Sequence, residues 1–367
     1  MCQRNHRHSI FCIVPPYVLS NIIRNGTDSQ RESALRTLSS DHTVRTLRAL
    51  RMAVPVTGAG SIMATTSAAI LPNGKPNRTI FDAQNQTDFA RAAVVRREGE
   101  AKSKDVTVNE AYNGLGDTYD FYWEMLQRNS IDGKGIPLLA YVHYDQDLDN
   151  AFWDGQEMVF GDGDAQFFNR FTIAVDIIAH ELTHGVTEKE AQLIYQDESG
   201  ALNESLSDVF GSLVKQYGSG GKTKQDAGKA DWLIGKGLFT GNVKGVALRS
   251  MKEPGTAFDD PTLGKDPQPD HMKNYNPTSG DNGGVHINSG IPNKAFYLVA
   301  VGIGGYAGDK AGRIWYETLR DPRLRADATF VEFALLTYAA AGRLYPGGSE
   351  RDIVRDAWAQ VGIVIPL

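Results

Sequence analysis

The sequence predicts an α+β fold whose first half is rich in strands and whose second half is helical. Between residues 70 and 165, turn signals such as Asp132-Gly133 separate short runs of β-type residues, and the clearest run is 138–144. A chain of 367 residues with 41% hydrophobic residues is long enough for two domains and a sizeable core. Strands followed by helices are typical of α+β architecture. From residue 171 onward, apolar residues recur with helical spacing over 171–187, 202–217, 290–302 and 330–341.

The first fifty residues differ from the rest of the chain. Residues 12–19 are apolar and expected to be extended, whereas 28–38 and 43–51 have helical spacing. A run rich in Gly, Ser, Thr and Ala at 57–69 indicates a linker or the loose start of a new domain. One helix is expected inside the β-rich part, at 108–128. We therefore expect an N-terminal segment and two structural units, with bounds at 1–52, 53–187 and 188–367.

Composition excludes several classes of partner. The net charge of -6 and the isoelectric point of about 5.8 argue against nucleic acid. No apolar run approaches the roughly 20 residues that span a bilayer, so no membrane partner is expected. The only cysteines are Cys2 and Cys12, which excludes a disulfide framework for the rest of the chain. Residues 9–16 are too short and too proline-broken for a secretory signal peptide, and none is expected.

The pattern His-Glu-Leu-Thr-His at 180–184 is the strongest chemical signal. Because residues four apart share one helix face, His180 and His184 can reach one ion. Zinc binds imidazole nitrogen and carboxylate oxygen, and a catalytic zinc site keeps one position for water. Glu181 lies beside that face, where a general base for this water is needed. A chance match would leave these polar groups without partners on a largely apolar helix, which burial disfavours.

A third ligand follows twenty residues after the second histidine. Glu204 opens another helical pattern, and an antiparallel return would bring its carboxylate opposite the histidine pair. Asp208 lies one turn further on the same face and could accept the second ring N–H of a zinc-bound histidine. The alternative is that both carboxylates form a solvated helix face.

Taken together, these residues resemble the thermolysin-like (gluzincin) metallopeptidases. The resemblance implies a two-domain catalytic unit with the active-site cleft between its β-rich and helical halves. It extends from about residue 70 to the C-terminus through further motifs in the same order. These motifs are Asn-Ala-Phe-Trp at 150–153, Gly-Asp-Gly-Asp at 161–164, Leu-Ile-Tyr-Gln at 193–196, Leu-Arg-Ser-Met at 248–251 and Asp-Asn-Gly-Gly-Val-His-Ile-Asn-Ser-Gly at 281–290.

The resemblance also implies roles for single residues. Tyr195 and His286 would donate hydrogen bonds to the developing oxyanion, and Asp281 would orient His286. Asn150 and the Ala151 carbonyl would hold the substrate backbone.

Further family residues have weaker signals on their own. Arg249 would bind the carbonyl on the leaving-group side, although a lone arginine on a loop is usually solvated. Asn203 would lie beside the metal ligands. The other histidines considered are expected to be structural, and they are His42, His143 and His271.

The chain departs from the family at the double calcium site beside the zinc helices. Asp176 matches one calcium ligand, but the next acidic ligand aligns with Lys215, and only Asp231 remains of the others. Because an ammonium cannot replace a carboxylate as a calcium ligand, the double site is predicted to be lost. We expect Lys215 to pair with Asp176 instead. Weaker calcium sites elsewhere remain open.

The N-terminal segment resembles the short pro-segment of the protealysin-like subgroup, on the motif Ile-Val-Pro-Pro-Tyr-Val-Leu at 13–19. The resemblance implies that residues 1–52 are a propeptide that inhibits the enzyme intramolecularly and is removed near residues 51–55. Members often lack a typical signal peptide, so secretion from the cytoplasm by another route is expected. Cys12 could cap zinc through its thiolate, or it could be a buried thiol in the propeptide interface.

The expected function is that of a zinc-dependent neutral endopeptidase in precursor form. It would cleave peptides or proteins before bulky apolar residues, by attack of zinc-activated water. Two alternatives remain at this stage. One is a zinc hydrolase that acts on non-peptide amides, and the other is a non-catalytic zinc protein.

Overall fold

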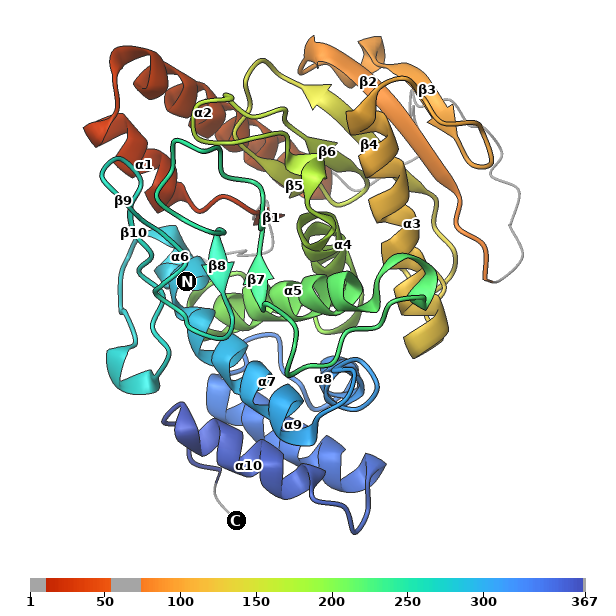
Figure 1. The fold of residues 1–367 in the computed structure, drawn as a ribbon, viewed down its shortest axis with the longest axis vertical. Helices are drawn as coiled ribbons and strands as arrows, with labels where there is room; N and C mark the ends of the chain where they lie inside the picture. Colours follow the sequence, from red (N-terminus) through yellow and green to blue (C-terminus); the bar gives the residue numbers. More distant parts are fainter. Residues whose placement is uncertain (1–10, 54–73, 366–367) are drawn as a thin grey trace.

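The computed structural model describes residues 11–53 and 74–365, and these have the predicted α+β fold (Figure 1). A six-stranded mixed sheet has the strand order β1-β5-β6-β4-β2-β3. Strands β2, β4 and β6 are parallel, and the remaining pairings are antiparallel. The strands of this sheet are β1 (Phe11–Cys12), β2 (Arg78–Gln86), β3 (Ala93–Arg97), β4 (Leu138–Tyr144), β5 (Ala151–Trp153) and β6 (Met158–Phe160).

The helical half follows the sheet, as predicted. Helices α3 (Val106–Leu126) and α4 (Val175–Glu190) each contact the sheet on one side and the first of the later helices on the other (Figure 1). The later helices are α5 (Asp197–Tyr217), α6 (Asp281–Asn288), α7 (Gly290–Ile303), α8 (Ala311–Leu319), α9 (Phe330–Leu344) and α10 (Glu350–Gln360). Two small hairpins pair β7 (Leu233–Ile234) with β8 (Arg249–Ser250), and β9 (Asp259–Asp260) with β10 (Gly264–Lys265).

Local sequence explains several helix starts. Asp105 caps α3, because its carboxylate accepts a backbone N–H of the first turn at 2.8 Å. Thr329 and Glu332 form a reciprocal capping box at the start of α9. The expected helix at 171–187 begins only at Val175, because residues 171–173 form a 3₁₀ turn instead.

The N-terminal segment corrects one expectation. Residues 12–19 are not extended throughout, because helix α1 (Pro16–Asn25) begins at the second of two prolines. Proline suits the first helical position, where its fixed φ fits and its missing N–H is not needed. The two helical stretches expected at 28–38 and 43–51 lie in one helix, α2 (Asp28–Ala53). Strand β1 joins the edge of the sheet beside β5, so this segment is part of the folded body (Figure 1).

Helices α4 and α5 form the buried centre of the molecule. From Asp176 to Thr187, every residue of α4 is buried. Gly211 of α5 lies so close to α4 that a Cβ atom there would lie 2.6 Å from the Asp176 carbonyl oxygen. A helix that is buried on all sides must find partners for its polar side chains inside the protein. These partners define the candidate site.

Candidate metal centre and substrate cleft

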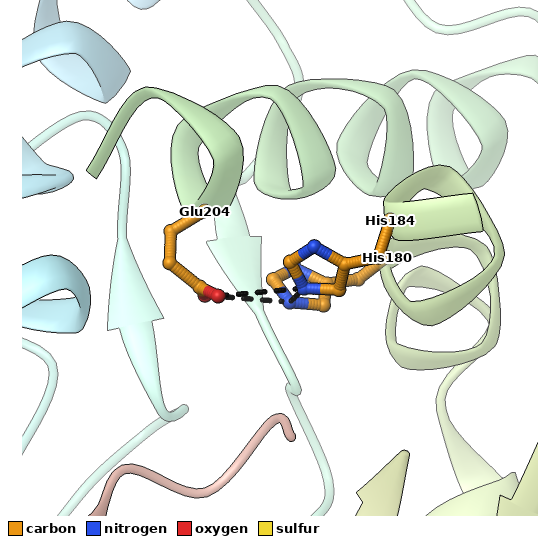
Figure 2. Close-up of side chains that lie close together, drawn as sticks. All are labelled: His180, His184 and Glu204. Carbon is orange, nitrogen blue, oxygen red and sulfur yellow. Dashed lines mark hydrogen bonds and ion pairs between the residues drawn. The ribbon is translucent and has the colours of Figure 1, made fainter. Parts of the chain in front are cut away.

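Three buried side chains from α4 and α5 point at one place (Figure 2). The ligand atoms of His180, His184 and Glu204 all lie within 4.8 Å of one another. The two Nε2 atoms are 3.0 Å apart, and the Glu204 oxygens lie 3.5 Å and 3.4 Å from them. One of these oxygens, Oε2, has no hydrogen-bond partner although it is buried. Two imidazoles and a carboxylate with an unsatisfied oxygen fit zinc, which supplies the missing partner.

The other ring nitrogen of each histidine is already engaged. Nδ1 of His180 donates to Asp208 at 2.8 Å, and Nδ1 of His184 donates to Asn203 at 2.8 Å. These bonds fix the ring orientation and leave both Nε2 lone pairs facing the common point. Burial, and to a smaller extent the neighbouring His180, lowers the pKa of His184 well below its usual value, so its imidazole is neutral, as a metal ligand must be.

Glu181 lies beside the three ligands and is fully buried. Its Oε2 accepts the backbone N–H of Trp153 at 3.1 Å, while its Oε1 has no hydrogen-bond partner. Burial and the neighbouring Glu204 raise the pKa of this carboxyl well above its usual value. Because its proton affinity is raised and one of its oxygens is unused, Glu181 is suited to accept a proton from water.

Two hydrogen-bond donors, Tyr195 and His286, lie against Glu204. The Tyr195 hydroxyl donates to Glu204 and lies 3.3 Å from Nε2 of His286. Asp281 accepts both the ring Nδ1–H of His286, at 2.6 Å, and its backbone N–H. Burial lowers the pKa of His286, but Asp281 and Glu204 outweigh it and raise the pKa to about 9. The ring is therefore a charged donor at neutral pH.

The turn at residues 281–284 holds Asp281 in place. All four of these residues have positive φ, between 50° and 85°. Gly283 is required there, because a Cβ atom would lie 2.0 Å from an oxygen of Asp197. This explains why the sequence carries two glycines directly before the helical turn with His286.

Asp208 connects a candidate metal ligand to Arg249, the residue expected to bind substrate. The Asp208 carboxylate accepts a hydrogen bond from His180 and another from the Asn293 side chain at 2.8 Å. It also forms an ion pair with Arg249 through two hydrogen bonds of 2.8 Å. Burial alone would raise the pKa of Asp208, but Arg249 and His180 outweigh it and lower the pKa below its usual value. Sequence reasoning missed Asn293, which carries no motif signal and lies 85 residues from Asp208.

The N-terminal segment lies next to this centre. The Ile13 N–H donates to the Ala151 carbonyl at 3.2 Å, and Arg249 donates to the Ile13 carbonyl at 3.1 Å. Asn150 accepts the next N–H, that of Val14, at 3.1 Å. Sequence reasoning also missed the buried Asp41 of α2. Its two carboxylate oxygens accept from the Asn150 side chain at 3.1 and 3.3 Å.

Three family models match the chain. The model of the thermolysin metallopeptidase catalytic domain matches residues 62–188, and that of the thermolysin metallopeptidase alpha-helical domain matches residues 191–363. The protealysin propeptide matches residues 12–43. An extracellular metalloprotease from Pectobacterium carotovorum subsp. carotovorum is 51% identical over 97% of this chain and 97% of its own. The chain belongs to the thermolysin family of metallopeptidases.

Two further thermolysin-family proteins are similar over nearly the whole chain. Protease PrtS of Photorhabdus sp. (strain Az29) is 47% identical over 96% of this chain and 92% of its own. The solved precursor of protealysin, a metalloproteinase from Serratia proteamaculans, has a TM-score of 0.84 at 50% identity and covers 96% of this chain and 100% of its own. This protein is accordingly a metalloendopeptidase precursor with a protealysin-type propeptide. The comparisons support neither a non-peptide hydrolase nor a non-catalytic zinc protein.

Lys215 of α5 lies between the carboxylates of Asp176 and Asp231. Its ammonium lies 2.9 Å from Asp176 and 3.0 Å from Asp231, and it also donates to the Leu233 carbonyl. The expected ion pair between Lys215 and Asp176 is thus present. Burial lowers the pKa of Lys215, but Asp176 and Asp231 outweigh it and raise the pKa above its usual value, so this amine is charged.

Cys12 and the other histidines lie outside the metal triad. The buried Cys12 thiol lies 3.9 Å from the Val14 carbonyl, while the Cys12 carbonyl lies 3.0 Å from His286. The thiolate cap stays a prediction. His143 bridges two carboxylates, the exposed His42 lies on α2, and His271 accepts a backbone N–H. Among the residues that the structure describes, no helix is long and apolar enough to cross a membrane.

Proposed function

We propose that the mature protein is a zinc-dependent neutral endopeptidase and that this chain is its latent precursor. The observation that carries the proposal is the buried triad of His180, His184 and Glu204 beside the half-satisfied carboxylate of Glu181. Zinc held by this triad would supply a Lewis acid that lowers the pKa of water towards about 7. The family implies the same metal.

The residues around the triad have separate roles in peptide hydrolysis. Glu181 accepts a proton from the attacking water and passes it to the leaving nitrogen. His286, charged and oriented by Asp281, donates to the developing oxyanion together with Tyr195. Preorganised donors of this kind contribute about 3–4 kcal/mol each to transition-state stabilisation. Asn203 and Asp208 keep the ligand rings in place.

The substrate backbone lies along β5. Asn150 and the Ala151 carbonyl bind its N–H groups, and Arg249 binds the carbonyl after the cleaved bond. Ile13, whose backbone makes these contacts, has a fully buried apolar side chain, which supports cleavage before a bulky apolar residue.

The remaining proposals concern the whole chain. Residues 1–52 act as an intramolecular inhibitor until a cut near 51–55, and the catalytic units are 53–187 and 188–367. The relative from Pectobacterium is named extracellular, which supports secretion of this protein. The double calcium site is lost, and Lys215 supplies the positive charge there.

The direct test is Glu181→Ala in the mature protein. We expect hydrolysis of a peptide library to fall by about 10²–10⁴-fold, because general-base catalysis is removed, while metal analysis still finds zinc. Glu188→Ala on the same helix is the matched control and should keep full activity. Equal activity in Glu181→Ala, or loss of its zinc, would contradict the assigned role. The wild-type digest should cut before Leu, Ile, Val and Phe.

A further inference from the structure

The pro-segment strand makes the contacts that a peptide substrate would make in the proposed mechanism. The N–H and carbonyl of Ile13 bind Ala151 and Arg249, and the N–H of Val14 binds Asn150. The pairing is antiparallel to β5, with Cys12 opposite Phe152. All three groups proposed to hold the leaving-group side of a substrate therefore hold two consecutive residues of the chain itself.

The peptide bond before these two residues lies where the catalytic groups converge. The Cys12 carbonyl oxygen lies 3.0 Å from Nε2 of His286, the donor proposed for the oxyanion. The Tyr195 hydroxyl lies 3.3 Å from the same nitrogen. In Figure 2 the pro-segment is the reddish ribbon that passes below the three proposed ligands. The unused oxygen of Glu181 belongs to the same buried centre.

We propose that the precursor hydrolyses its own Cys12–Ile13 peptide bond in place. This rests on the proposed function. Water adds its oxygen to the Cys12 carbonyl carbon, and the C–N bond to Ile13 breaks. One water proton passes through Glu181 to the Ile13 nitrogen, and the other leaves with the new carboxylic acid, which ionises. The products are a Cys12 carboxylate and an amino terminus at Ile13.

The cut leaves the inhibitor bound, because the part of the pro-segment after the cut has contacts of its own. Asn21 of α1 donates to the Leu263 carbonyl at 2.8 Å, and Thr37 of α2 accepts the N–H of Asp149 at 3.1 Å. Within the described residues, the piece before the cut contains strand β1, which pairs with β5, and the buried Cys12 side chain, which packs against residues of the sheet. Hydrolysis separates this short piece from residues 13–53, which stay in place next to the metal centre. Latency outlasts this first cut.

The first measurement is intact-mass and N-terminal analysis of the zinc-loaded precursor. We expect a species that begins at Ile13, formed at a rate independent of protein concentration, with peptide hydrolysis still low. Because Cys2 and Cys12 are the only cysteines, this species carries no thiol. Glu181→Ala should keep the full N-terminus and both thiols. Ile13→Leu, which keeps a bulky apolar side chain, should still be cut.

The second measurement uses the metal-free precursor and does not depend on catalysis. The amides of Ile13 and Val14 should exchange hydrogen at least about tenfold more slowly than in Ile13→Asp, because their acceptors are buried. Equally fast exchange would show that the strand is not held in this register and would overturn the proposal.

Three results of the first measurement would also overturn it. They are an intact N-terminus in the zinc-loaded precursor while the mature protein hydrolyses peptides, a first cut at another bond, and a rate that rises with protein concentration. If the mature protein hydrolyses no peptide bond at all, the proposed function fails instead.

Discussion

At the scale of single residues, side chains from the pro-segment complete the cleft that they block. Asn150 uses its amide oxygen to bind the Val14 N–H and its amide nitrogen to bind Asp41. Because a carboxylate only accepts hydrogen bonds, Asp41 fixes which end of the Asn150 amide faces the strand. The inhibitor therefore orients the group that holds it.

Replacing Asp41 by alanine should weaken latency. A hydrogen bond to a charged group contributes about 1.5–3 kcal/mol, so residual peptide hydrolysis by the intact precursor should rise about tenfold or more. The measurement is the initial rate, with mass spectrometry to exclude maturation. Asp28→Ala is the control, because Asp28 lies on the same helix with a fully exposed side chain. A rate equal to that of Asp28→Ala would show that the contact with Asn150 is dispensable.

His143 gives a residue-scale prediction about pH. Its ring lies 2.7 Å from Asp162 and 2.9 Å from Asp105, and the hydrogen bond with Asp162 raises the pKa to about 9 despite burial. Because this pKa is higher in the folded protein than in the unfolded chain, protonation of His143 stabilises the folded state. The stabilisation is complete below the unfolded-state pKa of about 6.5, and it is lost as the pH rises through about 9.

The matching variant is His143→Asn, since asparagine tolerates the positive φ of 53° at this position. We expect its melting temperature to lie below that of the parent at pH 6, and the difference to shrink by pH 10. Glu181→Ala in both proteins prevents self-digestion. A difference that does not change with pH would exclude an imidazolium between the two carboxylates.

Short-range motifs explain why so much of the site was accessible from sequence. His180, Glu181 and His184 share one helix turn, so their spacing alone brings them together. The role of Asp41 could not be predicted, because its contact with Asn150 joins residues 109 positions apart and follows no periodic pattern. Contacts of this kind depend on how the elements pack, which one sequence does not reveal.

At the scale of elements, the crossing of α4 and α5 sets the geometry of the centre. The sequence predicted both helices, because their apolar periodicity is long. It missed the helical start at Pro16, because Val14 and Pro15 continue the apolar run and hide the boundary. Lys215 of α5 ties the same two helices together through Asp176 of α4.

Removing this ammonium should destabilise the protein. Lys215→Met leaves the buried Asp176 without its cation, and we expect a loss of about 3–5 kcal/mol in the free energy of unfolding, measured by denaturant titration. Lys189→Met on α4, whose side chain is 41% exposed, should change it little. Wild-type stability should not depend on calcium through this site. Two calcium ions found near Asp176 by metal analysis would refute the prediction.

At the scale of the whole molecule, the metal triad lies where the packing of both halves meets. Zinc binds only the folded arrangement of His180, His184 and Glu204, so it should stabilise the entire chain. In the Glu181→Ala precursor, free zinc at a hundred times its dissociation constant should add about 2.7 kcal/mol to the free energy of unfolding. His184→Ala should lose this gain and His271→Ala should keep it, as thermal unfolding with and without zinc will measure. A gain that survives in His184→Ala would place the ion elsewhere.

The pairing of β1 with β5 has a consequence for which proteins can be attacked. Once the pro-segment leaves, the backbone groups of Ala151–Trp153 on that side are open to water, and a substrate that replaces the water along them must be an extended chain. A helical or tightly folded segment cannot present its N–H and C=O groups in that way. The target must therefore be locally unfolded before it is cut, so its conformational stability, as much as its sequence, decides its lifetime in the presence of this enzyme.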